Sequence, residues 1–133
     1  MQSQSFDHEI KRVLLTLEDI IRTIEQVEDW NRIVSSVEDY YSSQTGMQLL
    51  AANCALITAI GEGVNRCNRI LPDFLSDNFP SVPWRAIIGM RNRICHGYFD
   101  LDGELIFEAV KTDIPSLKET ISSAIDILKS NEP

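Results

Sequence analysis

The feature that most constrains the fold of this chain is a run of apolar residues near its start, spaced by threes and fours. The spacing persists for six turns, and an α-helix advances about 100° per residue, so these residues share one face. The pattern predicts one long amphipathic helix with apolar positions at Phe6, Ile10, Val13, Leu14, Leu17, Ile20, Ile21, Ile24 and Val27. Such a face must be buried, and the helix therefore needs partners elsewhere in the chain.

Two further stretches of helical spacing follow. Residues 33–41 predict a shorter helix, which ends before the break at residues 42–46. Residues 47–71 carry apolar side chains on more than one face, with alanines between them. A helix of this kind lies at the centre of a bundle or is shared with a partner chain.

The second half of the chain predicts two more helices. Residues 72–83 contain three prolines and predict a loop. Pro83 then begins a helix that runs to about His96 and Gly97, where glycine is a natural terminator. Asp113 is expected to cap a last helix with its buried face at Leu117, Ile121, Ala124, Ile125 and Leu128. Residues 104–111 fit either a strand or a helical turn.

These helices predict an all-α, up-down helical bundle, formed as one domain by residues 1–133. With 44% hydrophobic residues and no repeats, the chain can bury a core without staples. We expect Trp30 and Trp84 to anchor that core. The start lacks an apolar signal region, and the apolar run 49–60 is interrupted by Asn53 and Thr58, so we expect a cytoplasmic protein that is neither exported nor membrane-spanning.

The cysteines do not form a recognisable framework. Cys54, Cys67 and Cys95 are odd in number, and their spacings of 13 and 28 fit no Cys-x-x-Cys motif. Reduced thiols are therefore expected. The apolar stripe that contains Cys95 favours packing over catalysis for this residue.

The net charge of −8 excludes a general nucleic-acid coating protein, because sequence-independent binding needs summed positive charge. The charge is unevenly distributed, however. Residues 61–100 hold five basic against four acidic residues, and all five are arginines: Arg66, Arg69, Arg85, Arg91 and Arg93. They could form a local anion site or line an RNA path, or they could pair with carboxylates on solvated helix faces.

Several common chemistries are absent from the sequence. It has no Gly-rich phosphate loop, no His-Glu-x-x-His and no Gly-x-Ser-x-Gly. The two histidines are 88 positions apart, so we expect no metal site and no cofactor. His8 lies in the acidic first helix as a solvated residue, which leaves His96 as the candidate for acid–base work.

The surroundings of His96 admit two interpretations. A histidine at a helix C-terminus can cap the last carbonyls, and it can also act in catalysis with Arg91. In a regular helix Arg91 and His96 are about 140° apart, whereas Asn92 and His96 share a face. A site built from Arg91 and His96 therefore needs the helix to end or bend near Gly97, or a second subunit to supply another copy of the motif.

Four blocks of sequence add context to this motif. They are AIGE at 59–62, VPWR at 82–85, GMRNRICHGYF at 89–99 and DIPSL at 113–117. In order and content these blocks resemble the HepT family of HEPN-domain proteins. Residues 1–58 agree with the family only as helices in the expected place.

The resemblance implies a HEPN-type bundle that acts as the toxin of a prokaryotic toxin–antitoxin pair. Such a toxin is a metal-independent endoribonuclease and a homodimer with a composite site, neutralised by MntA, a minimal nucleotidyltransferase. By motif, the family's catalytic pair falls on Arg91 and His96, with Asn92 in support, and its adenylylated tyrosine falls on Tyr98. A larger hetero-oligomer with the antitoxin is an alternative assembly.

The residue types suit this chemistry. Imidazole has an unperturbed pKa of about 6.5 and can move protons near neutral pH, and guanidinium forks onto phosphate oxygens. Other assignments stay open. Tyr98 could pack against the bundle end with Phe99, and Glu62 fits a buried or interface hydrogen-bonding partner better than a general base. The whole chain could also be a non-catalytic docking subunit of a nucleotidyltransferase.

Overall fold

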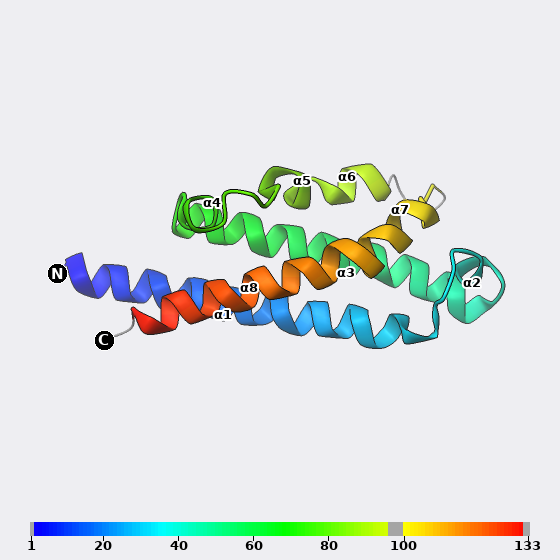
Figure 1. The fold of residues 1–133 in the computed structure, drawn as a ribbon, viewed down its shortest axis with the longest axis horizontal. Coiled ribbons are helices and arrows are strands. Elements are labelled where there is room, and N and C mark those ends of the chain that lie inside the picture. Colours follow the sequence, from blue (N-terminus) through cyan, green and yellow to red (C-terminus); the bar gives the residue numbers. More distant parts are fainter. Residues whose placement is uncertain (1, 96–99, 132–133) are drawn as a thin grey trace.

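Three long helices form the body of the molecule in the computed structural model, which describes residues 2–95 and 100–131. They are α1 (Gln2–Trp30), α3 (Gln44–Ile70) and α8 (Ile114–Ser130). Figure 1 shows α1 in blue, α3 in green and α8 in orange running along the long axis of the molecule. Within the described ranges the chain forms helices and turns, with one isolated antiparallel bridge between Cys95 and Leu101. The all-α prediction is confirmed.

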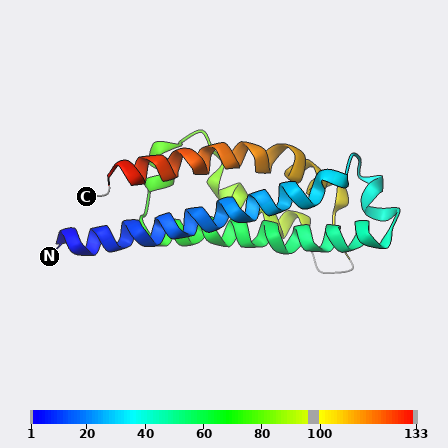
Figure 2. The same cartoon turned by 90° about the horizontal axis from the view of Figure 1, so that it is seen from below.

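The chain passes up and down the bundle four times. It runs along α1, returns along α3, advances through the short helices α5 (Trp84–Ile88) and α6 (Met90–Ile94), and returns along α8. Figure 2 shows both ends of the drawn chain at the same end of the bundle. The predicted up-down order is therefore correct.

The core is one continuous cluster that contains most of the predicted apolar face of α1. α1 packs against both α3 and α8, and Val13, Leu17, Ile24 and Val27 are fully buried. The periodicity failed only at its first position, because Phe6 is 53% exposed beyond the reach of the other helices.

Short helices form where the sequence predicted one longer helix and a loop. The predicted helix at 33–41 is a 3₁₀ turn, η1 (Asn31–Ile33), followed by the single-turn helix α2 (Glu38–Tyr41). The proline loop contains a one-turn helix, α4 (Phe74–Asn78). The ambiguous segment is helical: α7 (Gly103–Glu108) leads through a π-helical turn, η2 (Ala109–Asp113), into α8.

Two predicted roles are wrong. Trp30 is 44% exposed at the end of α1, although Asn31, which follows it, is buried. Trp84 is buried as expected, and its indole N–H donates to the Phe79 carbonyl at 3.1 Å. Asp113 makes no capping hydrogen bond, because the π-helical turn already supplies the turn before α8. Asp102 caps α7 by accepting from the Leu105 N–H.

A buried polar cluster fixes one end of the bundle. Asn31 and Asn53 exchange side-chain hydrogen bonds of 2.8 and 2.9 Å, and the Tyr40 hydroxyl donates to Asn31 at 2.9 Å. Lys111 donates to the Asn31 carbonyl oxygen at 3.1 Å. Asn53, which interrupts the apolar run of α3, thus links α3 to Asn31 after the end of α1 and to Tyr40 of α2.

A close approach between α3 and α5 positions the segment that carries Arg91 and Arg93. A Cβ on Gly61 would lie 3.1 Å from the Ile88 carbonyl oxygen and 3.2 Å from that of Ile87. Glycine therefore lets the backbone of α5 rest directly on α3. Helix α6, which follows α5, is held on the same side of α3 by the buried residues Met90 and Ile94.

Candidate functional site

Arg91 lies exposed on α6, at a small cavity between α6 and α3. The cavity has a volume of about 390 Å³, and its wall from α3 consists of small side chains. The lining residues are Ala51, Cys54, Ala55, Thr58, Arg91, Cys95 and Leu101. Arg91 is the only charged side chain among them.

Helix α6 ends earlier than the sequence predicted. Its last residue is Ile94, and Cys95 is extended, with φ −129° and ψ 89°. The Cys95 N–H donates to the Arg91 carbonyl at 2.8 Å, and the Asp102 N–H donates to the Ile94 carbonyl at 3.1 Å. A helix that continues to Gly97 is therefore ruled out.

The early end of α6 changes the geometric problem posed by the motif. The angle of about 140° between Arg91 and His96 applies only if one regular helix contains both residues. Asn92 and His96 likewise share a face only if one regular helix contains both residues. The expectation that they lie on one face therefore loses its basis. Asn92 is exposed on α6 next to Arg91. His96 and Tyr98 lie outside the described residues, although His96 is bonded directly to Cys95.

Cys54 and Cys95 are joined by a disulfide, with their Cα atoms 6.1 Å apart. The expectation of three free thiols is therefore wrong for this pair. Sequence spacing could not reveal the pair, because 41 positions separate the two residues and only the packing of α6 on α3 brings them together. The disulfide ties the residue before His96 to the centre of α3.

Cys67 is the remaining cysteine, and it is buried on α3. Burial raises the pKa of its thiol to about 12, against a smaller opposing effect of the nearby Arg66 charge. The thiolate is the reactive form of cysteine, so Cys67 is inert packing at neutral pH.

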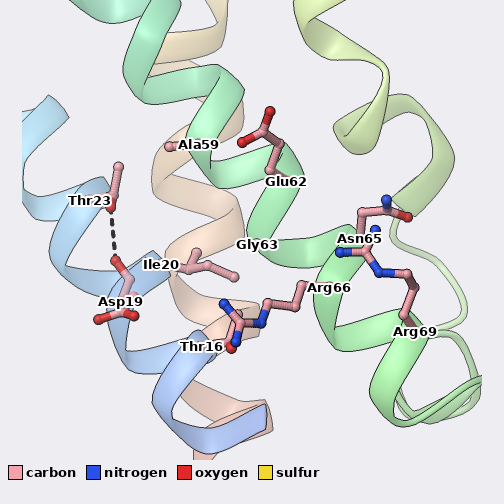
Figure 3. A pocket seen from close by; sticks show the side chains of 10 residues that line it. All are labelled: Thr16, Asp19, Ile20, Thr23, Ala59, Glu62, Gly63, Asn65, Arg66 and Arg69. Carbon is pink, nitrogen blue, oxygen red and sulfur yellow. Dashed lines mark hydrogen bonds between the residues drawn. The ribbon is translucent and has the colours of Figure 1, made fainter. Parts of the chain in front are cut away.

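The four arginines predicted to line an RNA path do not lie together. Arg66 and Arg69 line a cavity between α1 and α3 (Figure 3). Arg93 lines a different cavity, beside Glu108 and Asp113. Arg85 is exposed on α5. The structure thus separates the arginines into a pair and two single residues.

Glu62 is exposed on α3 and lines the cavity of Arg66 and Arg69. Of the two predicted roles, a buried partner is wrong, because Glu62 is exposed, whereas a partner at an interface stays a prediction. His8 is exposed on α1, as predicted.

The face of α3 beside Arg91 is apolar, and the residues that the structure describes leave it uncovered. Met47 is 44% exposed, and Ala55 and Ala59 are also exposed. By length and mean hydropathy, 1.3, α3 could cross a membrane, although core helices share this property. In this structure α3 packs against α1, α2, α5 and α6. The prediction of apolar residues on more than one face of α3 is confirmed.

Sequence reasoning missed the residues of α3 that face Arg91. Ala51, Ala55 and Thr58 recur at helical spacing and are small enough to leave the cavity open. A search for small residues, rather than for large apolar ones, could have found this stripe.

Comparison with known proteins adds the family. Residues 17–124 match the sequence model of the family described as "Ribonuclease HepT-like". A protein of Thermococcus cleftensis named "Probable ribonuclease HepT" is 31% identical over 102 residues, which are 77% of this chain and 86% of that protein.

Two proteins of Methanocaldococcus jannaschii align over 92% of this chain. One is named a "Putative RNase"; it is 23% identical, and the alignment covers 94% of its length. The other is named "Gamma-glutamylcyclotransferase and putative RNase"; it is 30% identical, and 51% of its length is covered. No solved structure matches the chain.

Proposed function

This chain belongs to the ribonuclease HepT-like family, and we propose that it is an endoribonuclease that cleaves RNA without a metal ion. The observation that carries the proposal is the position of Arg91. Among the described residues that line a small cavity it is the one charged side chain, and the helix that bears it ends at Ile94. A cation and an imidazole are therefore five positions apart in the sequence, at the end of this helix and just beyond it.

The reaction needs three contributions from the protein. A base removes the proton of the ribose 2′-hydroxyl, whose oxygen attacks the adjacent phosphorus. An acid gives a proton to the leaving 5′-oxygen, and a cation stabilises the charge on the phosphorane oxygens. We assign the proton transfers to His96 and the charge stabilisation to Arg91, because imidazole titrates near neutral pH and guanidinium stays charged.

A homodimer would complete this site. One chain provides a single His96, whereas the mechanism uses one base and one acid. Two copies meeting along the uncovered face of α3 would bring two Arg91 side chains and two His96 side chains to one cleft. The exposed Met47, Ala55 and Ala59 support this face as the interface. Asn92, exposed beside Arg91, would orient the phosphate.

We further propose that the protein acts in the cytoplasm as the toxin of a toxin–antitoxin pair. Its antitoxin would be an MntA-like nucleotidyltransferase that transfers AMP from ATP to the Tyr98 hydroxyl and releases pyrophosphate. The added phosphodiester would lie within two residues of His96 and occupy the Arg91 guanidinium. RNA would then be repelled from the site.

The experiment is incubation of the purified protein alone with RNA in EDTA. The control substrate has the same sequence with a 2′-O-methyl group at every position, so it lacks the attacking hydroxyl. We expect cleavage of the RNA only, with 2′,3′-cyclic phosphate ends. Binding of both oligonucleotides without cleavage would instead support the docking subunit of a nucleotidyltransferase and contradict the proposal.

A further inference from the structure

A second cavity on α3 lies away from Arg91, between α1 and α3, and has a volume of about 630 Å³. This volume is within the range of about 300–1,000 Å³ that small-molecule sites occupy. Figure 3 shows one wall formed by α1, with Thr16 and Asp19, and the other by α3, with Glu62, Arg66 and Arg69.

The floor of the cavity is formed where α1 and α3 touch. A Cβ on Gly63 would lie 2.8 Å from Cγ1 of Ile20, so glycine lets the side chain of Ile20 rest on the backbone of α3. Ile20 is buried, and its neighbours Asp19 and Thr23 rise on the wall above it. The cavity is thus a shallow polar hollow with an apolar floor.

Two positive charges in this hollow lack a protein partner. Arg66 extends from α3 toward Thr16 on α1, and Arg69 lies beside Asn65 (Figure 3). In the part of the chain that the structure describes, neither has a carboxylate oxygen within 4.0 Å, whereas Arg22 pairs with Asp19 and Arg32 with Asp29. The two guanidinium groups lie apart, one near Thr16 and the other near Asn65, and each suits a phosphate, which it can bind through paired N–H donors.

The other polar groups of the hollow include the carboxylates of Asp19 and Glu62, which accept, and the amide of Asn65, which both donates and accepts. The Glu62 carboxylate is exposed at the rim. The Thr16 hydroxyl donates its proton to the Arg12 carbonyl at 3.0 Å, which leaves its oxygen free to accept. A carboxylate accepts hydrogen bonds from base amino groups and from ribose hydroxyls. Phosphate, ribose and base together make a nucleotide the ligand that matches this set.

The hollow also lies on the same helix as the cavity of Arg91. Cys54 and Thr58 line the Arg91 cavity, and Ala59, Glu62 and Arg66 line the hollow. From Cys54 to Arg66 the helix rises about 18 Å. An RNA strand that reaches both cavities must therefore extend beyond the nucleotides at the cleaved bond.

We propose that the hollow between α1 and α3 is a subsite for the RNA substrate, away from the cleaved bond. Arg66 and Arg69 each bind a phosphate of the strand, and Glu62 accepts from a ribose or base. The inference deepens the proposed ribonuclease function and rests on it. It selects Arg66 and Arg69 as strand-binding residues from the four candidate arginines and leaves out Arg85 and Arg93.

The test compares a trinucleotide with a twelve-nucleotide RNA as substrates. The test variant replaces Arg66 and Arg69 by alanine together, and the matched control is Arg85→Ala, another exposed arginine. We expect the double variant to raise KM for the long RNA about tenfold or more with kcat unchanged, and to leave kcat/KM for the trinucleotide unchanged. Equal KM for the long RNA in the double variant and in the wild type would overturn the subsite.

A binding measurement separates this inference from the proposed function. Fluorescence anisotropy of a 2′-O-methyl twelve-mer needs no cleavage. The double variant should bind it about tenfold or more weakly. The slope of log binding constant against log salt concentration should fall in magnitude by about two, whereas Arg85→Ala should change neither quantity. If the wild type cleaves nothing but this difference appears, the ribonuclease function fails, while RNA binding by Arg66 and Arg69 is supported.

The last arm asks whether the ligand is a free nucleotide. Calorimetry with AMP, GMP, CMP and UMP measures binding without a strand. Binding of one of these by the wild type but not by the double variant, with unchanged affinity for the twelve-mer, would assign the hollow to free nucleotides and overturn the RNA subsite.

Discussion

Arg91 is the residue on which the catalytic proposal depends most within the described chain. It is exposed, it makes no ion pair there, and its removal leaves no hole in the core. Arg93 is its matched neighbour, since it is exposed on the same helix but lines another cavity.

We therefore expect Arg91→Ala to lower the rate of RNA cleavage about 100-fold or more, the range found when a transition-state donor is removed. Arg93→Ala should change the rate less than threefold, and both variants should keep the wild-type melting temperature. Equal losses in the two variants would show that α6 contributes only general positive charge.

Asn53 is a residue whose role could be recognised only in the structure. In the sequence it is a polar interruption of an apolar run. In the fold it bonds to Asn31 and to the Tyr40 hydroxyl, and all three side chains are buried. Asn53→Ala leaves polar groups of Asn31 and Tyr40 without a partner, so it should lower the free energy of unfolding by about 1–3 kcal/mol in urea titrations. A loss below about 0.5 kcal/mol would mean that water replaces Asn53.

Tyr40 also predicts a pH dependence. Burial raises the pKa of its hydroxyl to about 12, against a smaller lowering by its hydrogen bond with Asn53. The unfolded chain ionises near the ordinary value of 10, while the folded protein holds the proton, so the stabilisation is complete below pH 10 and is lost between pH 10 and 12. Tyr40→Phe should lose less stability over that interval than the wild type, as measured by urea unfolding at each pH. Identical curves would contradict this assignment.

At the scale of elements, the predictability of the fold follows the length of the helix. α1, α3 and α8 were predicted because each has four or more turns, over which an apolar face repeats. α4, α5 and α6 have five residues each, too few for a period, and their ends are set by contacts such as Gly61 against α5. The site was therefore predicted by motif, whereas the early end of α6 and the cavity against α3 were not.

The disulfide between α3 and the end of α6 predicts an effect of reduction. Closing a loop over 41 positions stabilises a chain by about 4 kcal/mol in the chain-entropy account. Dithiothreitol should therefore lower the melting temperature of the oxidised wild type. The variant with Cys54→Ser and Cys95→Ser should melt at one temperature with or without the reductant. A wild-type protein whose melting point ignores dithiothreitol would contradict the pairing.

At the scale of the whole molecule, α3 packs against other helices of the bundle but keeps one face exposed. The core joins α1, α3 and α8, while Ala55 and Ala59 stay exposed beside the Arg91 cavity. One chain supplies a single His96 where the mechanism uses a base and an acid, and it has an exposed apolar face beside Arg91. A composite site between two copies requires both features.

The dimer can be tested by adding charge to that face. The wild type should have twice the mass of one chain, 15.1 kDa, in light scattering. Met47→Arg, outside the Arg91 cavity, should give a monomer that no longer cleaves RNA, since two copies cannot bury an added guanidinium against each other. The control, Ala86→Arg, adds the same group to an exposed position on α5 and should stay dimeric. A monomeric wild type that cleaves RNA would contradict the composite site.

The most direct test of the central claim is the rate of RNA cleavage in EDTA by the wild type and by His96→Ala, with the product ends identified by mass spectrometry. The account predicts that the wild type leaves 2′,3′-cyclic phosphate ends, and that His96→Ala is slower by about 100-fold or more at an unchanged melting temperature. Equal rates for the two proteins would contradict the mechanism. If His96→Ala is slow only because it has melted, His96 has the structural role of a helix cap instead of a catalytic role.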